Sequence, residues 1–195
     1  MAYQITFPDG KQREFQEAMN CYEIAKSISN GLAKNALAAK IDGEVKELST
    51  VIDHDVALEI LTFDSEEGKQ VFWHSSSHIM AQAVLRLFPN TKFGIGPAIK
   101  EGFYYDFDSD HTFVPEDLEK IQKEMQKIVA EKLKFERKEI SRAEALQMFA
   151  DRGEKYKVEL IEDLPEDAVI STYTQGEFTD LCSGPHLFST EPVKA

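Results

Sequence analysis

The stretch Trp73-His74-Ser75-Ser76-Ser77-His78-Ile79-Met80 places two histidines four residues apart in a run with helical apolar spacing. Residues four apart lie on one face of a helix, so both imidazoles are expected to point at the same spot. A second close pair, Cys182 and His186, flanks Gly184-Pro185, which predicts a turn. These four side chains are compatible with a tetrahedral zinc site. They are equally compatible with a metal-free hydrolytic pocket, because histidine can carry protons near neutral pH.

The two pairs together are stronger evidence for a functional site than either pair is alone. A single His-x-x-x-His is usually two histidines on a solvated helix face. Here three of the five histidines and one of the two cysteines fall in the two motifs. That concentration favours a shared site over coincidence.

Composition limits the class of protein. A chain of 195 residues with 42% hydrophobic content can form one large domain or two small ones. No apolar run reaches membrane-spanning length, the N-terminus has no secretory pattern, and two cysteines are too few for a disulfide framework. A reduced, cytoplasmic protein is therefore expected. The net charge of −13 argues against tight, independent binding to a nucleic-acid backbone.

A local cluster of basic residues lies between Lys120 and Lys138, with glutamates interleaved among the lysines. A basic strip of this kind could contact RNA. The alternation of charge favours a solvated helix face instead.

The first sixty residues predict a compact β-grasp, ubiquitin-like unit. The expected order is strand, strand, helix, strand, strand, strand, over residues 3–7, 11–15, 22–28, 36–41, 44–48 and 56–62. Asn30-Gly31 is expected to end the helix. The polar segment Asp64–Lys69 suits a linker or a helix start, and the domain boundary is placed there.

The remainder predicts an α+β unit in which a β-sheet packs against helices. Helices are expected from the histidine stretch to Phe88, over Pro115–Leu133 with Leu118 in its apolar stripe, and from a capping box at Ser141 to Asp151. Strands are expected over residues 102–107, 135–140, 156–161, 169–173 and 178–181. Gly94 and Gly96 mark a shaped loop where a ligand could approach the backbone closely.

Taken together, the motifs resemble the N-terminal part of bacterial threonyl-tRNA synthetases over essentially the whole chain. The matching residues are His74-Ser75-x-x-His78, Gly94-x-Gly96-Pro97, Gly102-Phe103-Tyr104-Tyr105-Asp106, Arg152-Gly153-Glu154-x-Tyr156-Lys157 and Asp180-x-Cys182-x-Gly184-Pro185-His186. Gly184-Pro185 favours the threonyl branch, because the related alanyl editing proteins more often carry Gly-Gly-Thr there. The resemblance implies a TGS domain at 1–63 and an editing domain at 64–195.

The resemblance implies proofreading of mischarged tRNA. The substrate would be serine esterified to the acceptor end of threonine tRNA, with no cofactor required in this part of the enzyme and no membrane involved. Family members continue into an aminoacylation domain that uses ATP and zinc, and they dimerise through such later domains. We therefore expect an excised N-terminal fragment that does not ligate threonine.

Site roles follow from the resemblance residue by residue. His74 and Lys157 are the catalytic candidates that position or activate the attacking water. The substrate-binding candidates are His78, Cys182, His186, Asp180, Tyr105 and Gly96. Tyr105 is expected to pack against the terminal adenosine or to close the pocket, and Tyr104 to belong to the core. Because neither catalytic candidate belongs to the apolar pattern, their removal is expected to leave the fold intact.

Two other functions compete with this one. The first is a zinc-dependent alanyl-type tRNA deacylase, since the alanyl relatives bind zinc with the same His, His, Cys, His pattern. The second is a non-catalytic module that binds RNA or a partner. The closer resemblance favours the threonyl type, for which we expect no required metal.

Overall fold

The computed structural model describes residues 2–194, which fall into two compact units. The first unit comprises residues 2–72 together with Pro185–Phe188, and the second comprises Trp73–Gly184 together with residues 189–194. Helix α3 (Glu66–Leu87) begins in the first unit and continues into the second, so the polar segment at 64–69 is mostly the start of a helix. Within residues 2–194, no helix combines the length and the apolar character needed to cross a membrane.

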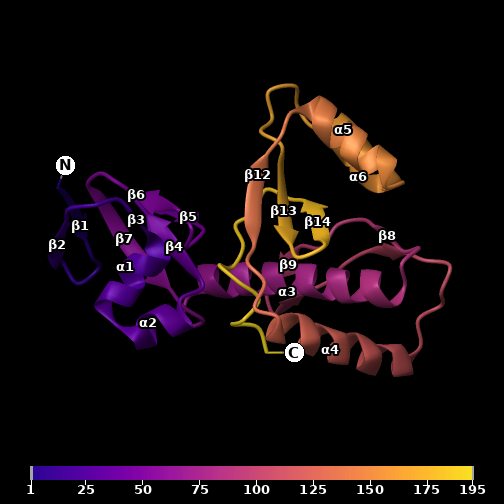
Figure 1. Cartoon of the computed structure of the whole chain (residues 1–195), viewed down its shortest axis with the longest axis horizontal. Helices are drawn as coiled ribbons and strands as arrows, with labels where there is room; N and C mark the ends of the chain where they lie inside the picture. The colour runs from indigo at the N-terminus through magenta and orange to yellow at the C-terminus, as the bar shows by residue number, and fades with distance from the viewer. Residues whose placement is uncertain (1, 195) are drawn as a thin grey trace. The chain divides into compact units, whose positions relative to one another are not determined.

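The first unit is built on a five-stranded mixed sheet with the strand order β2-β1-β7-β4-β5 (Figure 1). The strands are β1 (Tyr3–Thr6), β2 (Gln12–Phe15), β4 (Ala38–Ile41), β5 (Glu44–Lys46) and β7 (Val56–Leu61). Strands β1 and β7 pair in parallel, whereas the other neighbours are antiparallel. A short ladder joins β3 (Met19–Asn20) to β6 (Val51–Ile52). This arrangement confirms the predicted β-grasp fold.

Helix α1 (Cys21–Ile28) begins at a capping box formed by Asn20 and Glu23, and it buries Cys21 and Ile24 in the core of the first unit. The predicted end of this helix just before Asn30-Gly31 is confirmed, since α1 ends at Ile28, but a second helix that was not predicted, α2 (Asn30–Asn35), begins directly after it. Ser29 causes the break. Its extended backbone ends α1, while its hydroxyl accepts a hydrogen bond from the Leu32 N–H and so caps α2.

The first unit also includes residues from the far end of the chain. The Phe188 ring stacks on the Tyr22 ring, with centroids 4.6 Å apart and planes 4° from parallel. Phe188 also packs against the buried core cluster that contains Ile24 and Leu48. The first unit is therefore discontinuous in sequence.

The second unit has four helices and several short strands, in agreement with the predicted α+β class. Besides α3, the helices are α4 (Pro115–Ala130), α5 (Arg142–Asp151) and α6 (Lys155–Asp163). An antiparallel sheet joins β12 (Glu136–Glu139), β13 (Ser171–Gln175) and β14 (Phe178–Leu181). Two-stranded ladders pair β8 (Lys92–Phe93) with β11 (Phe107–Asp108) and β9 (Ala98–Ile99) with β10 (Gly102–Phe103).

Helices α5 and α6 lie side by side (Figure 1), and they share a small hydrophobic core. The predicted capping box at Ser141 is present, with Glu144 as its partner. The strand predicted over 156–161 is wrong, because these residues belong to α6. Gly153, at φ 66°, turns the chain after α5, and Val158 and Ile161 then face Phe149 with helical spacing.

Two further predictions about buried residues are wrong. Leu118 in α4 is 65% exposed, so the apolar stripe of this helix is narrower than its sequence pattern. The aromatic stretch at 102–107 is interrupted between β10 and β11. There Tyr104 is 44% exposed, whereas Tyr105 is 8% exposed and belongs to the interior.

The basic cluster of α4 and the segment after it is locally neutralised. Lys120 pairs with Asp117, Lys127 with Glu124, and Lys132 with Glu191. These contacts agree with the interpretation of a solvated, charge-balanced face rather than a free positive strip.

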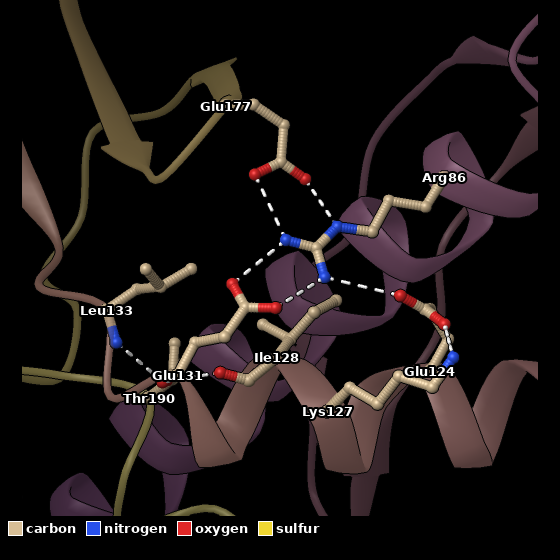
Figure 2. Close-up of polar contacts among 8 residues, drawn as sticks. All are labelled: Arg86, Glu124, Lys127, Ile128, Glu131, Leu133, Glu177 and Thr190. Atoms are coloured by element: carbon tan, nitrogen blue, oxygen red, sulfur yellow. Dashed lines mark hydrogen bonds and ion pairs between the residues drawn. The ribbon is translucent and has the colours of Figure 1, made fainter.

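One arginine connects three elements of the second unit. The Arg86 guanidinium, near the end of α3, contacts Glu124 and Glu131 of α4 and Glu177 of the β13–β14 turn (Figure 2). The contacts with Glu131 and Glu177 each use both carboxylate oxygens. Two-point geometry of this kind gives an ion pair directional specificity.

The Arg86 contacts make the stability of the protein depend on pH. The guanidinium lowers the pKa of Glu177 from its ordinary 4.5 to about 2. Because the folded-state pKa is depressed, this stabilisation is present above pH 4.5 and is lost as the pH falls toward 2. We expect Glu177→Gln to lower the unfolding midpoint at neutral pH, and its deficit against wild type to shrink over that acidic range. Thermal melts across the pH series test this; a deficit independent of pH would contradict it.

Candidate functional site

Three of the predicted site residues lie together in the second unit. The Nε2 atom of His74 is 3.3 Å from the Sγ atom of Cys182, and the His74 and His78 rings meet edge to face at 5.3 Å. One ligand-type atom from each of these three residues lies within 4.8 Å of the others. The four-residue spacing on α3 therefore brings both imidazoles to one place, as the sequence predicts.

The loop after β14 places the Cys182 thiol. The Cys182 N–H donates to the Ser171 carbonyl at 3.1 Å, and the Ser171 hydroxyl donates to the Cys182 carbonyl at 2.6 Å. Beyond it, Gly184 adopts φ 75° and donates its N–H to the Cys182 Sγ at 3.3 Å. The backbone of Cys182 is thus fixed to β13, and its sulfur lies between an amide and the His74 ring.

A buried ion pair forms the second half of the site. The Lys157 Nζ is 2.6 Å from the Asp180 Oδ1, and the two side chains are only 3% and 4% exposed. The same ammonium donates to the Gly94 carbonyl at 2.7 Å and to the Tyr105 hydroxyl at 3.3 Å. The Tyr105 hydroxyl in turn donates to the Asp180 Oδ2. An ammonium has three hydrogens, so these contacts use all the donors of Lys157.

The charges in this network follow from burial and proximity. Burial alone would raise the pKa of Asp180, but the Lys157 ammonium and its other neighbours outweigh burial, and the pKa is lowered. Burial lowers the pKa of His78 to about 3, so this imidazole is neutral at physiological pH. It lies 3.7 Å from the Asp180 Oδ2 as a polar contact rather than a charged pair. Burial also raises the pKa of Tyr105, which stays a hydrogen-bond donor.

The Gly94–Gly96 loop is held against this network at both glycines. Lys157 binds the Gly94 carbonyl, and the buried Ser77 hydroxyl donates to the Gly96 carbonyl at 2.7 Å. Only glycine fits at position 96, because a Cβ there would lie 2.1 Å from the Tyr105 ring. The predicted close approach at this loop is thus to a tyrosine of the same chain.

His186, the remaining predicted residue, is buried and belongs to the segment Pro185–Phe188 of the first unit. It follows Cys182 by four positions in the chain. Its assigned role in the site stays a prediction.

Several supporting residues were not identified from the sequence. Ser77 and Ser171 each bind a backbone carbonyl of the site region. The half-buried Glu154 accepts the Phe93 N–H at 3.2 Å, beside Gly94, and burial raises its pKa. Ser77 lies one position before His78 on the histidine helix, and this adjacency in the sequence could have indicated that it belongs to the site region. Glu154 stands in the motif from Arg152 to Lys157, where no role was assigned to it, and Ser171 had no such signal.

A cavity of about 370 Å³ adjoins the Gly94 loop. Its lining residues are Gly94, Ile95, Asp106, Phe107, Asp108, Tyr156, Glu159, Leu160 and Asp163. None of the predicted site residues is among them. The site therefore rests on the buried polar network and not on this cavity.

Known proteins similar to this chain are described as TGS-domain proteins or as threonine–tRNA ligases. Residues 3–62 match the TGS domain family. Threonine–tRNA ligases of Clostridioides difficile and Clostridium tetani are 56% and 58% identical over 191 residues, and that of Finegoldia magna is 52% identical over 193. These alignments cover 98–99% of this chain but about 30% of the relatives' length, at their N-terminal end.

The buried ion pair changes one expectation from the sequence. Removing Lys157 leaves a buried carboxylate without its main partner, so Lys157→Met is expected to cost about 3–5 kcal/mol of stability rather than leave the fold unaffected. Asp180→Asn is expected to cost a similar amount. The double variant should cost much less than the sum, because no charge then remains unpaired.

Urea unfolding followed by the fluorescence of Trp73 measures this, since Trp73 is the single tryptophan and belongs to the second unit. His74→Ala, which removes no partner of a buried charge pair, serves as the matched control. Additive effects of the two single variants would contradict the interpretation.

Proposed function

We infer that this chain corresponds to the N-terminal region of threonyl-tRNA ligases, and we propose that its second unit hydrolyses serine wrongly esterified to threonine tRNA. The observation that carries the proposal is the Lys157–Asp180–Tyr105 network beside His78, with the His74–Cys182 contact next to it. Burial, a fixed charge pair and several proton-carrying groups within a few ångströms are typical of hydrolytic sites. The high identity to ligases for threonine supports the choice of tRNA.

A separate hydrolytic site has a physical reason. Serine lacks one methyl group of threonine, and a missing methyl changes binding by only about 1–3 kcal/mol. A synthetic site that accepts threonine therefore cannot reject serine strongly. A second site that excludes threonine by size removes the error after it is made.

In the proposed reaction, water attacks the ester carbonyl. His74 is the candidate to orient this water and accept its proton, because its ring is held by Cys182 on one side and His78 on the other. Lys157 supplies positive charge for the developing oxyanion. Its weakest contact, the 3.3 Å bond to Tyr105, is the one that a substrate oxygen could replace.

The other residues bind and orient the substrate. Asp180 is ionised and suits the seryl ammonium group, while neutral His78 can donate or accept a hydrogen bond. Cys182 forms a wall of the pocket and is not a nucleophile, and His186, four positions later in the chain, is a further substrate-binding candidate. Tyr105 and Gly96 shape the side that faces the terminal adenosine.

We propose that the reaction needs no metal. The donor types of His74, His78 and Cys182 suit zinc, and one ligand-type atom from each lies within 4.8 Å of the others. Zinc bound there would occupy His74, which the proposal assigns to the attacking water. The chain is expected to act in the cytoplasm on tRNA supplied for translation, and ligation of threonine is expected of the part of the relatives that this chain does not cover.

The first test is substrate choice. The full chain is expected to release serine from seryl-tRNA for threonine at a measurable rate and to leave threonyl-tRNA largely intact, which loss of the labelled amino acid from each tRNA would measure. His74→Ala is expected to lower the rate by about 100-fold or more, as for loss of a general base. Equal rates on both esters, or a fully active His74→Ala variant, would rule out the proposed specificity or role.

The second test concerns zinc. Treatment with a chelator, followed by dialysis, is expected to leave seryl ester hydrolysis unchanged, and elemental analysis is expected to find no stoichiometric zinc. Activity that is lost on chelation and restored by zinc alone would replace the proposal with the alanyl-type mechanism.

A further inference from the structure

Helix α3 carries a column of polar side chains at four-residue intervals. They are His74, His78, Gln82 and Arg86, of which His78 and Gln82 are fully buried. Four helical residues rise about 6 Å and turn about 40° past a full circle, so neighbouring members of the column share a face while the column winds slowly around the helix. The first two belong to the candidate site. The last lies two turns beyond His78 and takes no part in it.

Strand β14 and its flanking residues lie along this column, and the first two contacts are one matched step apart. Two strand residues rise about 6.6 Å, close to the step of the helix column. Cys182 meets His74 at 3.3 Å, Asp180 meets His78 at 3.7 Å, and Glu177 meets Arg86 at 2.5 and 3.1 Å. The strand therefore matches the helix step at the first two contacts, and Glu177, in the turn three residues before Asp180, contacts Arg86, eight residues beyond His78.

The turn end of the hairpin is held by a two-point contact. Arg86 grips the Glu177 carboxylate through Nε and Nη2 together, a two-point contact that fixes direction as well as distance (Figure 2). Beside Glu177, Gly176 turns the chain at φ 57°, and a Cβ at this position would lie 3.0 Å from Leu133 and 3.4 Å from Gln82. The turn thus packs directly against α3 and has little freedom to slide.

We propose that the Arg86–Glu177 pair is a positioning device for the site: it sets the register of β14 along α3 and thereby holds Asp180 and Cys182 opposite His78 and His74. This deepens the proposed function, on which its rate measurement rests. Arg86 and Glu177 touch no reacting group; they act through the backbone of the β13–β14 hairpin.

The chain offers a matched control for this idea. Glu131 also binds Arg86 through both oxygens, at 2.8 and 3.0 Å, and its exposure of 40% is close to the 49% of Glu177 (Figure 2). Glu131 lies at the end of α4, which carries no site residue. Glu177→Gln and Glu131→Gln therefore remove equivalent charges from the same guanidinium, but only the first loosens the hairpin.

Two measurements on the full chain compare these variants. In nuclear magnetic resonance spectra, the ring signals of His74 and His78 are expected to shift in Glu177→Gln and to stay in place in Glu131→Gln, with His54 of the first unit as the internal reference. In seryl-tRNA hydrolysis, Glu177→Gln is expected to lower kcat by about 10-fold with little change in KM, because small displacements of reacting groups are costly. Arg86→Lys keeps the positive charge but not the two-point contact. Its kcat is expected to lie between the kcat of wild type and that of Glu177→Gln.

Each outcome separates the two proposals. Unmoved histidine signals in Glu177→Gln, or equal shifts in both variants, would overturn the positioning role whatever the rates are. A Glu177→Gln chain that does not fold would overturn it as well, since the pair would then be a general structural contact. A wild-type chain without hydrolytic activity would reject the proposed function, and the histidine spectra would still decide the register.

Discussion

The ion pair between Lys157 and Asp180 is the contact on which the second unit's candidate site depends. It joins α6 to β14, and through the same ammonium it holds the Gly94 carbonyl and the Tyr105 hydroxyl. A buried pair of this kind adds little net stability compared with apolar side chains of equal size, because both charges lose their water. Its physical effect is instead to fix four groups from four segments at defined distances and to keep Asp180 ionised.

Much of the architecture follows from local rules that act on the sequence. The β-grasp unit could be predicted because its strands are short, alternate cleanly and are separated by turn residues. The meeting of His74 and His78 follows from the period of the helix alone. Their approach to Cys182 could be proposed only by pairing two motifs a hundred residues apart, and the structure places these residues in contact.

Other features depend on contacts that no local pattern encodes. The sequence around Lys157 alternates enough to suggest a strand, yet Gly153 and the core of Phe149 and Ile161 make it a helix that turns the lysine inward. Tyr104 and Tyr105 are equally β-prone, and it is tertiary contacts that bury Tyr105: its hydroxyl bonds Asp180 and Lys157, and its ring lies against Gly96. The grip of Arg86 on Glu177 joins residues 91 positions apart and could not be read from spacing.

The segment Pro185–Phe188 belongs to the first unit, and this affects where the chain can be cut into separate domains. Phe188 completes the aromatic stack on Tyr22, although it lies after Cys182 in the sequence. A cut after residue 63 therefore separates the β-grasp fold from one of its own packing partners. The family match ends at residue 62, whereas the compact unit of this chain also includes Pro185–Phe188. The boundary of the matched sequence family and the boundary of the compact unit therefore fall at different residues of this chain.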